Sequence, residues 1–251
     1  MIDLHCHLLP GVDDGPETMD ESLDYALTAS RAGTDRIVAT PHVEQVDVAE
    51  LPLRVDELRS ALDEAGIGLQ VDCGGELKPH SIASLSDGEL DTIAHGPAGR
   101  RWVLLEVPFR GLGQDLLDAA NELRRRGFAP LLAHPERASR FRDSIPVLRQ
   151  QVDRGAGVQM NVGPLTGDES PERHEAALRL LRIGLPSALA TDAHPPDRPY
   201  TLGQGRALAI EGGATEADAT RLVDDAPRAL LTDGLGFSQP ARGYRGGVYG
   251  P

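Results

Sequence analysis

Two histidines stand two residues apart near the start of the chain, where a short apolar run ends. His5 and His7 flank Cys6 in the segment MIDLHCHLLPGVDDG. Side chains at positions i and i+2 of a β-strand point to the same side, so both imidazoles can reach one metal ion while Cys6 points away. A pair of exposed surface histidines would show the same spacing. The motif alone therefore leaves both interpretations open.

The elements that would position these histidines are short β-rich runs that alternate with amphipathic helical segments. The runs span residues 2–4, 36–39, 69–73, 102–107, 130–133, 157–161 and 187–190. Strands alternating with helices predict an α/β fold with a parallel sheet, either open or closed into a barrel. In a parallel barrel the carboxyl ends of all strands lie on one rim, where such folds place their active sites.

Residues with metal-ligand chemistry gather at the ends of these runs. They are His5, His7, Asp14, His42, Glu76, Glu106, His134, Asp192 and His194. Carboxylates packed together without cations would repel one another and take up protons, and divalent ions remove that conflict. One zinc-like ion takes only about four ligands. We therefore expect two or three ions sharing a bridging carboxylate, and the mixed ligands allow manganese, zinc or iron.

Two arginines lie close to the predicted ligands. Arg137 follows His134 by three residues, and Arg198 follows His194 by four. A guanidinium group matches the geometry of phosphate oxygens, and sites with several metals recur in phosphoester hydrolysis. The sequence therefore predicts a phosphoryl substrate, with Arg137 and Arg198 as its catalytic contacts.

The chain lacks the motifs of other phosphoryl-transfer and hydrolase chemistries. A cysteine phosphatase needs an arginine six positions after its cysteine, but Val12 follows Cys6 and Pro79 follows Cys73 at that spacing. The sequence also contains no G-x-S-x-G elbow, no phosphate-binding P-loop and no G-x-G-x-x-G dinucleotide fingerprint. These absences favour attack by a metal-activated hydroxide over covalent catalysis.

Bulk composition sets the remaining expectations. A net charge of −14 argues against a nucleic-acid partner. No segment is apolar enough to insert in a membrane and no signal peptide is evident, so we expect a cytoplasmic protein. The 251 residues suit a single domain. We expect a catalytic barrel over residues 1–237 and a flexible C-terminal tail, rich in glycine, over residues 238–251.

Taken in chain order, the motifs resemble a known superfamily. The segments HCH, LPGVDDG, ATPH, GGE, LLEVP, AHPER and TDAH are similar to those of PHP (polymerase and histidinol phosphatase) proteins. Within that superfamily they most resemble the manganese-dependent tyrosine phosphatases of bacterial capsule and exopolysaccharide operons, the CpsB/YwqE type. The similarity runs from Met1 to about Phe237. It implies a distorted (β/α)7 barrel, the PHP fold, in a single domain.

The resemblance also implies a cluster of three divalent ions, manganese in relatives. By motif matching, the first ion would be bound by His5, His7, Glu76 and Asp192. Glu76 would bridge to a second ion held by Glu106 and His134, while Asp14, His42 and His194 would hold the third. Arg137 and Arg198 match the arginines that contact the substrate phosphate.

The implied reaction is hydrolysis of phosphotyrosine in a protein such as an autophosphorylated bacterial tyrosine kinase. Hydroxide would attack phosphorus in line without a covalent phosphoenzyme. Three features depart from the family pattern. Cys6 stands where serine is usual, and the turn before Arg198 is one residue short. The first helix also lacks the E-x-x-R pattern linked to ring-shaped oligomers, so a homo-oligomer stays open.

Three other functions fit part of the sequence. A PHP phosphatase of small molecules, such as histidinol phosphate, would use the same ligands. An amidohydrolase barrel also begins with H-x-H, but it expects a metal-bridging lysine near the fourth strand, where this chain has Glu106. A noncatalytic module could keep the metals for stability or docking, although it would not need both arginines.

Overall fold

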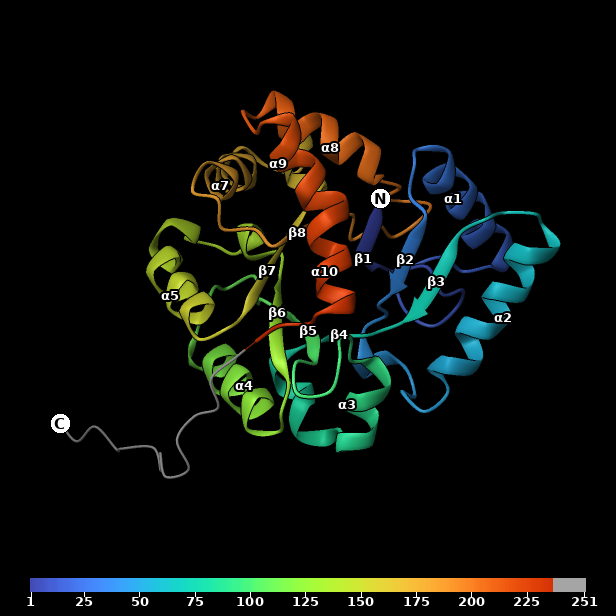
Figure 1. Cartoon of the computed structure of the whole chain (residues 1–251), viewed down its shortest axis with the longest axis horizontal. Helices are drawn as coiled ribbons and strands as arrows, with labels where there is room; N and C mark the ends of the chain where they lie inside the picture. The colour runs from blue at the N-terminus through green and yellow to red at the C-terminus, as the bar shows by residue number, and fades with distance from the viewer. Residues whose placement is uncertain (237–251) are drawn as a thin grey trace.

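Short parallel strands alternate with helices around a barrel in the computed structural model, which describes residues 1–236 (Figure 1). The strands are β1 (Ile2–Cys6), β2 (Arg36–Ala39), β3 (Gln70–Cys73), β4 (Glu76–Leu77), β5 (Trp102–Glu106), β6 (Ala129–Ala133), β7 (Gly157–Asn161) and β8 (Ala188–Ala190). The longer helices are α1 (Met19–Arg31), α2 (Leu51–Glu64), α3 (Asp87–Ile93), α4 (Gln114–Arg125), α5 (Phe141–Asp153), α7 (Pro171–Arg182), α8 (Leu202–Glu211) and α10 (Ala226–Thr232). Shorter ones are α6 (Gly163–Thr166) and α9 (Glu216–Thr220).

Backbone hydrogen bonds close two sheets, ordered β1-β2-β3 and β4-β5-β6-β7-β8, into one irregular barrel. On one side the Asp192 N–H donates to the His5 carbonyl at 2.8 Å, joining the end of β8 to β1. On the other side the Glu76 N–H donates to the Pro41 carbonyl at 3.0 Å, joining β4 to the residues after β2. The fold is therefore the expected distorted α/β barrel in a single domain.

The third predicted strand is interrupted, which corrects the sequence interpretation. The predicted run 69–73 forms β3 from Gln70 to Cys73, but Glu76 opens the separate strand β4 instead of lying in a loop. Gly74 allows the chain to cross close to β2, because a Cβ atom there would lie only 2.6 Å from Cγ1 of Val38. The wall thus has seven positions, one of them shared by β3 and β4.

An apolar cluster fills the interior of the barrel and closes its amino end. Its fully or nearly buried members are Ile2, Leu4, Val38, Trp102, Leu104, Ala129, Leu131, Ala133, Ala188 and Leu230. Helix α10 lies across the strands in Figure 1, and the indole N–H of Trp102 donates to the Leu230 carbonyl at 2.7 Å. A larger apolar layer packs the outer face of the strands against the helices. Polar groups are left to the opposite, carboxyl end.

Two helices begin at strong sequence signals. Thr18 and Glu21 form a capping box at the start of α1, and Ser86 and Glu89 do so at α3. None of the helices in the described part of the chain is both long and apolar enough to cross a membrane. The predicted tail, 238–251, lies outside the described residues, so that boundary stays a prediction.

Candidate metal centre

All nine predicted ligands converge at the carboxyl end of the barrel. Their donor atoms fall into four overlapping groups, each with its atoms within 4.8 Å of one another. The groups are His7, Asp14, His42 and His194; His5, His134 and Asp192; His5, His7 and Glu76; and Glu76, Glu106 and His134. Eight of these residues have side chains that are buried or nearly so, while Asp14 is 59% exposed at the mouth.

An irregularity in β1 turns the two leading histidines toward the site. Ile2 and Leu4 belong to the inner cluster, whereas Cys6 packs in the outer layer. Simple alternation would place Cys6 with Leu4 and would turn His5 outward. The pairing of β1 with β2 shifts register between Asp3 and Cys6, and such a bulge redirects the side chains beyond it. His5 therefore lies inside β1, which runs two residues beyond the predicted strand, and it still shares a side with His7.

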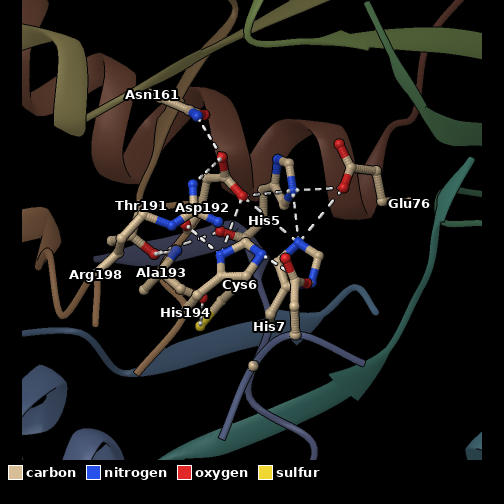
Figure 2. Close-up of polar contacts among 12 residues, drawn as sticks. His5, Cys6, His7, Glu76, Asn161, Thr191, Asp192, Ala193, His194 and Arg198 are labelled. Atoms are coloured by element: carbon tan, nitrogen blue, oxygen red, sulfur yellow. Dashed lines mark hydrogen bonds and ion pairs between the residues drawn. The ribbon is translucent and has the colours of Figure 1, made fainter. Parts of the chain in front are cut away.

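The distances around these histidines suit a shared ion. Nε2 of His5 and Nε2 of His7 lie 3.3 Å apart (Figure 2). Oε2 of Glu76 lies 3.5 and 3.4 Å from these nitrogens, and Oδ1 of Asp192 lies 3.3 and 3.5 Å from them. Two ligands about 2.0–2.2 Å from one ion, at tetrahedral angles, are about 3.3–3.6 Å apart. The observed spacing matches that value.

Glu76 connects the rest of the cluster. Its Oε1 atom lies 2.9 Å from Nε2 of His134, and its Oε2 atom lies 3.1 Å from Nδ1 of His42. At the mouth, Nε2 of His194 lies 3.2 Å from Oδ1 of Asp14. Nδ1 of His42 and Nε2 of His194 are buried and form no hydrogen bond with proper geometry. Buried nitrogens that face carboxylates without bonding to them fit metal ligands.

Two of the predicted ligands stand at positions of unusual backbone conformation. His134 follows β6 with φ of 37°, and Asp192 follows β8 with φ of 49°. Non-glycine residues in this left-handed region are uncommon, and such strain is concentrated at functional sites. In both cases the turn directs a side chain from the end of a strand into the cluster.

Charges in the cluster strongly perturb one another. Burial and the negative charge of Glu76 raise the pKa of Glu106 to about 7. Burial opposes protonation of His7, but hydrogen bonds to Asp13 and Glu76 raise its pKa to about 10. Burial and the neighbouring charge of His7 lower the pKa of His194 to about 4. Cations would relieve this conflict by favouring deprotonated ligands throughout, so the donor set fits divalent metal ions.

Residues behind the ligands were not identified from the sequence. Oε1 of Gln159 lies 2.9 Å from Nδ1 of His5, and the Gln159 amide donates to Oδ1 of Asn161 at 2.7 Å. Asn161 in turn donates to Oδ2 of Asp192 at 2.6 Å (Figure 2). The spacing Q-x-N on β7 was the available signal, because residues at i and i+2 share one side of a strand.

The two predicted arginines reach the same place. Nη1 of Arg137 donates to Oδ2 of Asp192 at 2.8 Å, and Nη1 of Arg198 lies 3.8 Å from that oxygen. The short turn before Arg198 is held by paired backbone hydrogen bonds with His194. Both arginines line a cavity of about 680 Å³ that contains most of the ligands. Lys78, the only lysine of the sequence, and His80 line it as well.

The barrel and its rim cluster define a PHP-type hydrolase fold. The match to the family described as "Capsular polysaccharide synthesis, CpsB/CapC" covers residues 1–232, and the chain belongs to that family. The tyrosine-protein phosphatase YwqE of Bacillus subtilis is 30% identical over 198 residues, which are 77% of each protein. The tyrosine-protein phosphatase CpsB of Streptococcus pneumoniae is 26% identical over 251 residues, or 94% of this chain and 100% of that protein.

A solved structure shares the architecture. It comes from work on YwqE and CpsB, described there as unique metal-dependent tyrosine phosphatases. Its TM-score to this chain is 0.77 at 26% identity, and the match covers 96% of this chain and 100% of the other. The resemblance inferred from the short motifs is therefore confirmed across the whole barrel.

Proposed function

We propose that this chain is a metal-dependent phosphatase that hydrolyses phosphotyrosine in proteins. One observation carries the proposal: nine side chains with metal-ligand chemistry cluster at one end of the barrel, and seven of them line a cavity of about 680 Å³ together with two guanidinium groups. The family relatives named tyrosine-protein phosphatases support this substrate over a small molecule such as histidinol phosphate.

The nine ligands would hold three divalent ions, with manganese as the expected metal and zinc or iron as alternatives. His5, His7, Glu76 and Asp192 serve the first ion, and the distances between their donor atoms support this grouping. Glu76, Glu106 and His134 would hold the second ion, and Asp14, His42 and His194 would hold the third. When bound, such ions activate water and neutralise charge on phosphoryl oxygens.

The protein's own residues bind and orient the phosphate. Arg137 donates to Asp192 in the structure and is placed to donate to the phosphoryl oxygens as well. Arg198 reaches the same carboxylate from the turn that follows β8. Both guanidinium groups stabilise charge that grows during in-line attack. Tyrosinate leaves readily because the phenol pKa is near 10, so this reaction makes little demand on a general acid.

The setting of the enzyme follows from the same proposal. A tyrosine kinase of capsule or exopolysaccharide synthesis is the proposed substrate, and the reaction would take place in the cytoplasm.

The decisive assay compares a phosphotyrosine peptide, histidinol phosphate and a nucleotide with enzyme of defined metal content. We expect the highest kcat/KM for the peptide, about three metal ions per chain by elemental analysis, and less sensitivity to orthovanadate than a cysteine phosphatase shows. A higher kcat/KM for histidinol phosphate than for the peptide would identify that small molecule, instead of phosphotyrosine, as the substrate. Inactivity of the fully metal-loaded protein would indicate a noncatalytic module.

A further inference from the structure

A second cavity, of about 900 Å³, adjoins the metal-site cavity. It is formed by the turn after β6 together with α5 and α7. Phe109 and Arg137 line both cavities, so the two are neighbours across these side chains. Cavities of this size accommodate drug-sized molecules or a short stretch of peptide.

Phe109 forms the wall between the cavities. Its side chain is 49% exposed, and among the described residues Leu53 is the one other large apolar side chain that is exposed. The guanidinium groups of Arg137 and Arg173 lie over its ring, 4.9 and 5.5 Å from the centroid. A peptide whose phosphotyrosine enters the metal-site cavity can therefore pass over this aromatic surface into the second cavity.

The second cavity is lined by arginines in a protein of net negative charge. They are Arg137, Arg140, Arg142, Arg173 and Arg179. Arg137 is bound to Asp192, Arg173 donates to Glu169 at 2.7 Å, and Arg142 lies 3.9 Å from Glu175. Within residues 1–236, Arg140 and Arg179 form no ion pair. Nε of Arg179 is also buried without a hydrogen-bond partner.

The acidic residues of the lining do not satisfy these two arginines. Glu136 is buried and accepts a hydrogen bond from the Asn161 N–H at 2.7 Å. Glu175 lies near Arg142 and Arg182. Asp143 and Glu172 are exposed to solvent in the first turns of α5 and α7, where the helix dipole favours them.

We propose that the second cavity binds the substrate segment next to the phosphotyrosine and that Arg140 and Arg179 recognise an acidic side chain there. Guanidinium groups without partners favour a carboxylate, because the charge-assisted hydrogen bonds satisfy their exposed donors. This inference rests on the proposed phosphotyrosine phosphatase activity and adds a sequence preference to it.

The test compares two phosphotyrosine peptides of equal length, one with glutamate and one with glutamine at the flanking positions. For the unaltered enzyme we expect kcat/KM to be about tenfold higher with the glutamate peptide. The double variant Arg140→Gln, Arg179→Gln should lower that ratio to near one. Hydrolysis of free phosphotyrosine, which is too short to reach the second cavity, should change little.

Arg149→Gln is the matched control, since Arg149 is exposed on the same helix α5 and lies outside the cavity lining. It should keep the full preference for glutamate. Active enzyme without such a preference, or a preference that survives in the double variant, would overturn this inference alone. If the unaltered, metal-loaded enzyme hydrolyses no phosphotyrosine substrate, the proposed activity and this inference are overturned together.

Discussion

Asp13 and His7 are joined by a 2.6 Å contact between Oδ2 of the carboxylate and Nδ1 of the ring. The same oxygen accepts a hydrogen bond from the backbone N–H of His42 at 3.0 Å. One carboxylate thus orients two of the proposed ligand residues and leaves Nε2 of His7 facing Glu76 and Asp192. Carboxylates behind metal-binding histidines set the tautomer and raise the basicity of the ring.

Replacing Asp13 with asparagine should weaken metal binding about tenfold to 100-fold, because His7 loses its charged partner. Competition with a chelator of known affinity would measure the change. Asp24→Asn is a suitable control, since Asp24 is an exposed residue of α1 away from the site. Equal metal affinity in both variants would contradict the role given to Asp13.

Arg137→Ala should lower kcat/KM by about 100-fold, because a donor to the phosphoryl oxygens is lost. Metal content should stay near that of the unaltered protein, since Arg137 is not among the grouped metal-ligand side chains. Steady-state kinetics and elemental analysis of the same sample separate the two effects. Loss of metal along with activity would instead assign Arg137 to holding Asp192 in place.

Removal of the metal ions should destabilise the folded barrel. Glu76, Glu106 and Asp192 are at most 9% exposed, so their charges lose the compensation that cations provide. Binding at about 100 times the dissociation constant contributes about 2.7 kcal/mol, which for a chain of this size corresponds to about 5–10 °C in Tm. Thermal unfolding before chelation, after it and after metal is restored would measure this. An unchanged Tm after verified metal loss would contradict the prediction.

His95 gives a pH dependence that is separate from the metal centre. It packs against Trp102 with ring centroids 5.1 Å apart, and burial lowers its pKa from 6.5 to about 4. Below about pH 6.5 the unfolded chain binds the proton more readily than the folded one, so stability falls as the pH drops toward about 4. This histidine alone should cost up to about 3 kcal/mol over that range.

The variant His95→Phe keeps an aromatic ring beside Trp102 but cannot take up the proton. Urea unfolding at a series of pH values should give a shallower loss of stability in the variant than in the unaltered protein. Parallel curves for the two proteins between pH 4 and 6.5 would refute the assignment.

The convergence of the nine proposed ligands could be predicted because each lies close to the end of a run with a local pattern. His134 directly follows a β-rich run, Asp192 and His42 come two and three residues after theirs, and parallel packing brings those ends together. Gln159 was not predicted because the role of an amide inside a buried strand depends on its contact with His5, which is distant in sequence. The interruption at Gly74 likewise depends on contact with Val38 from another strand.

The bulge in β1 escaped prediction for a similar reason. Strict alternation places His5 on the outer side with Asp3, and only the pairing with β2 reveals the shift that turns it inward. Arg140 and Arg179 were not noticed either, because their common cavity forms only when α5 and α7 pack side by side. Local patterns predicted which residues could bind metal and phosphate. The β1 bulge and the second cavity depend on contacts between segments that are distant in sequence.

The hydrogen bond from Asp192 to His5 joins the first strand of the chain to the residues that follow the last strand. A nascent chain leaving the ribosome exposes His5 and His7 first, but their carboxylate partner Asp192 emerges only after all eight strands and most of the helices. The centre is therefore assembled late in synthesis. A polypeptide that stalls before that point retains histidines able to capture a metal ion but no closed barrel to retain it.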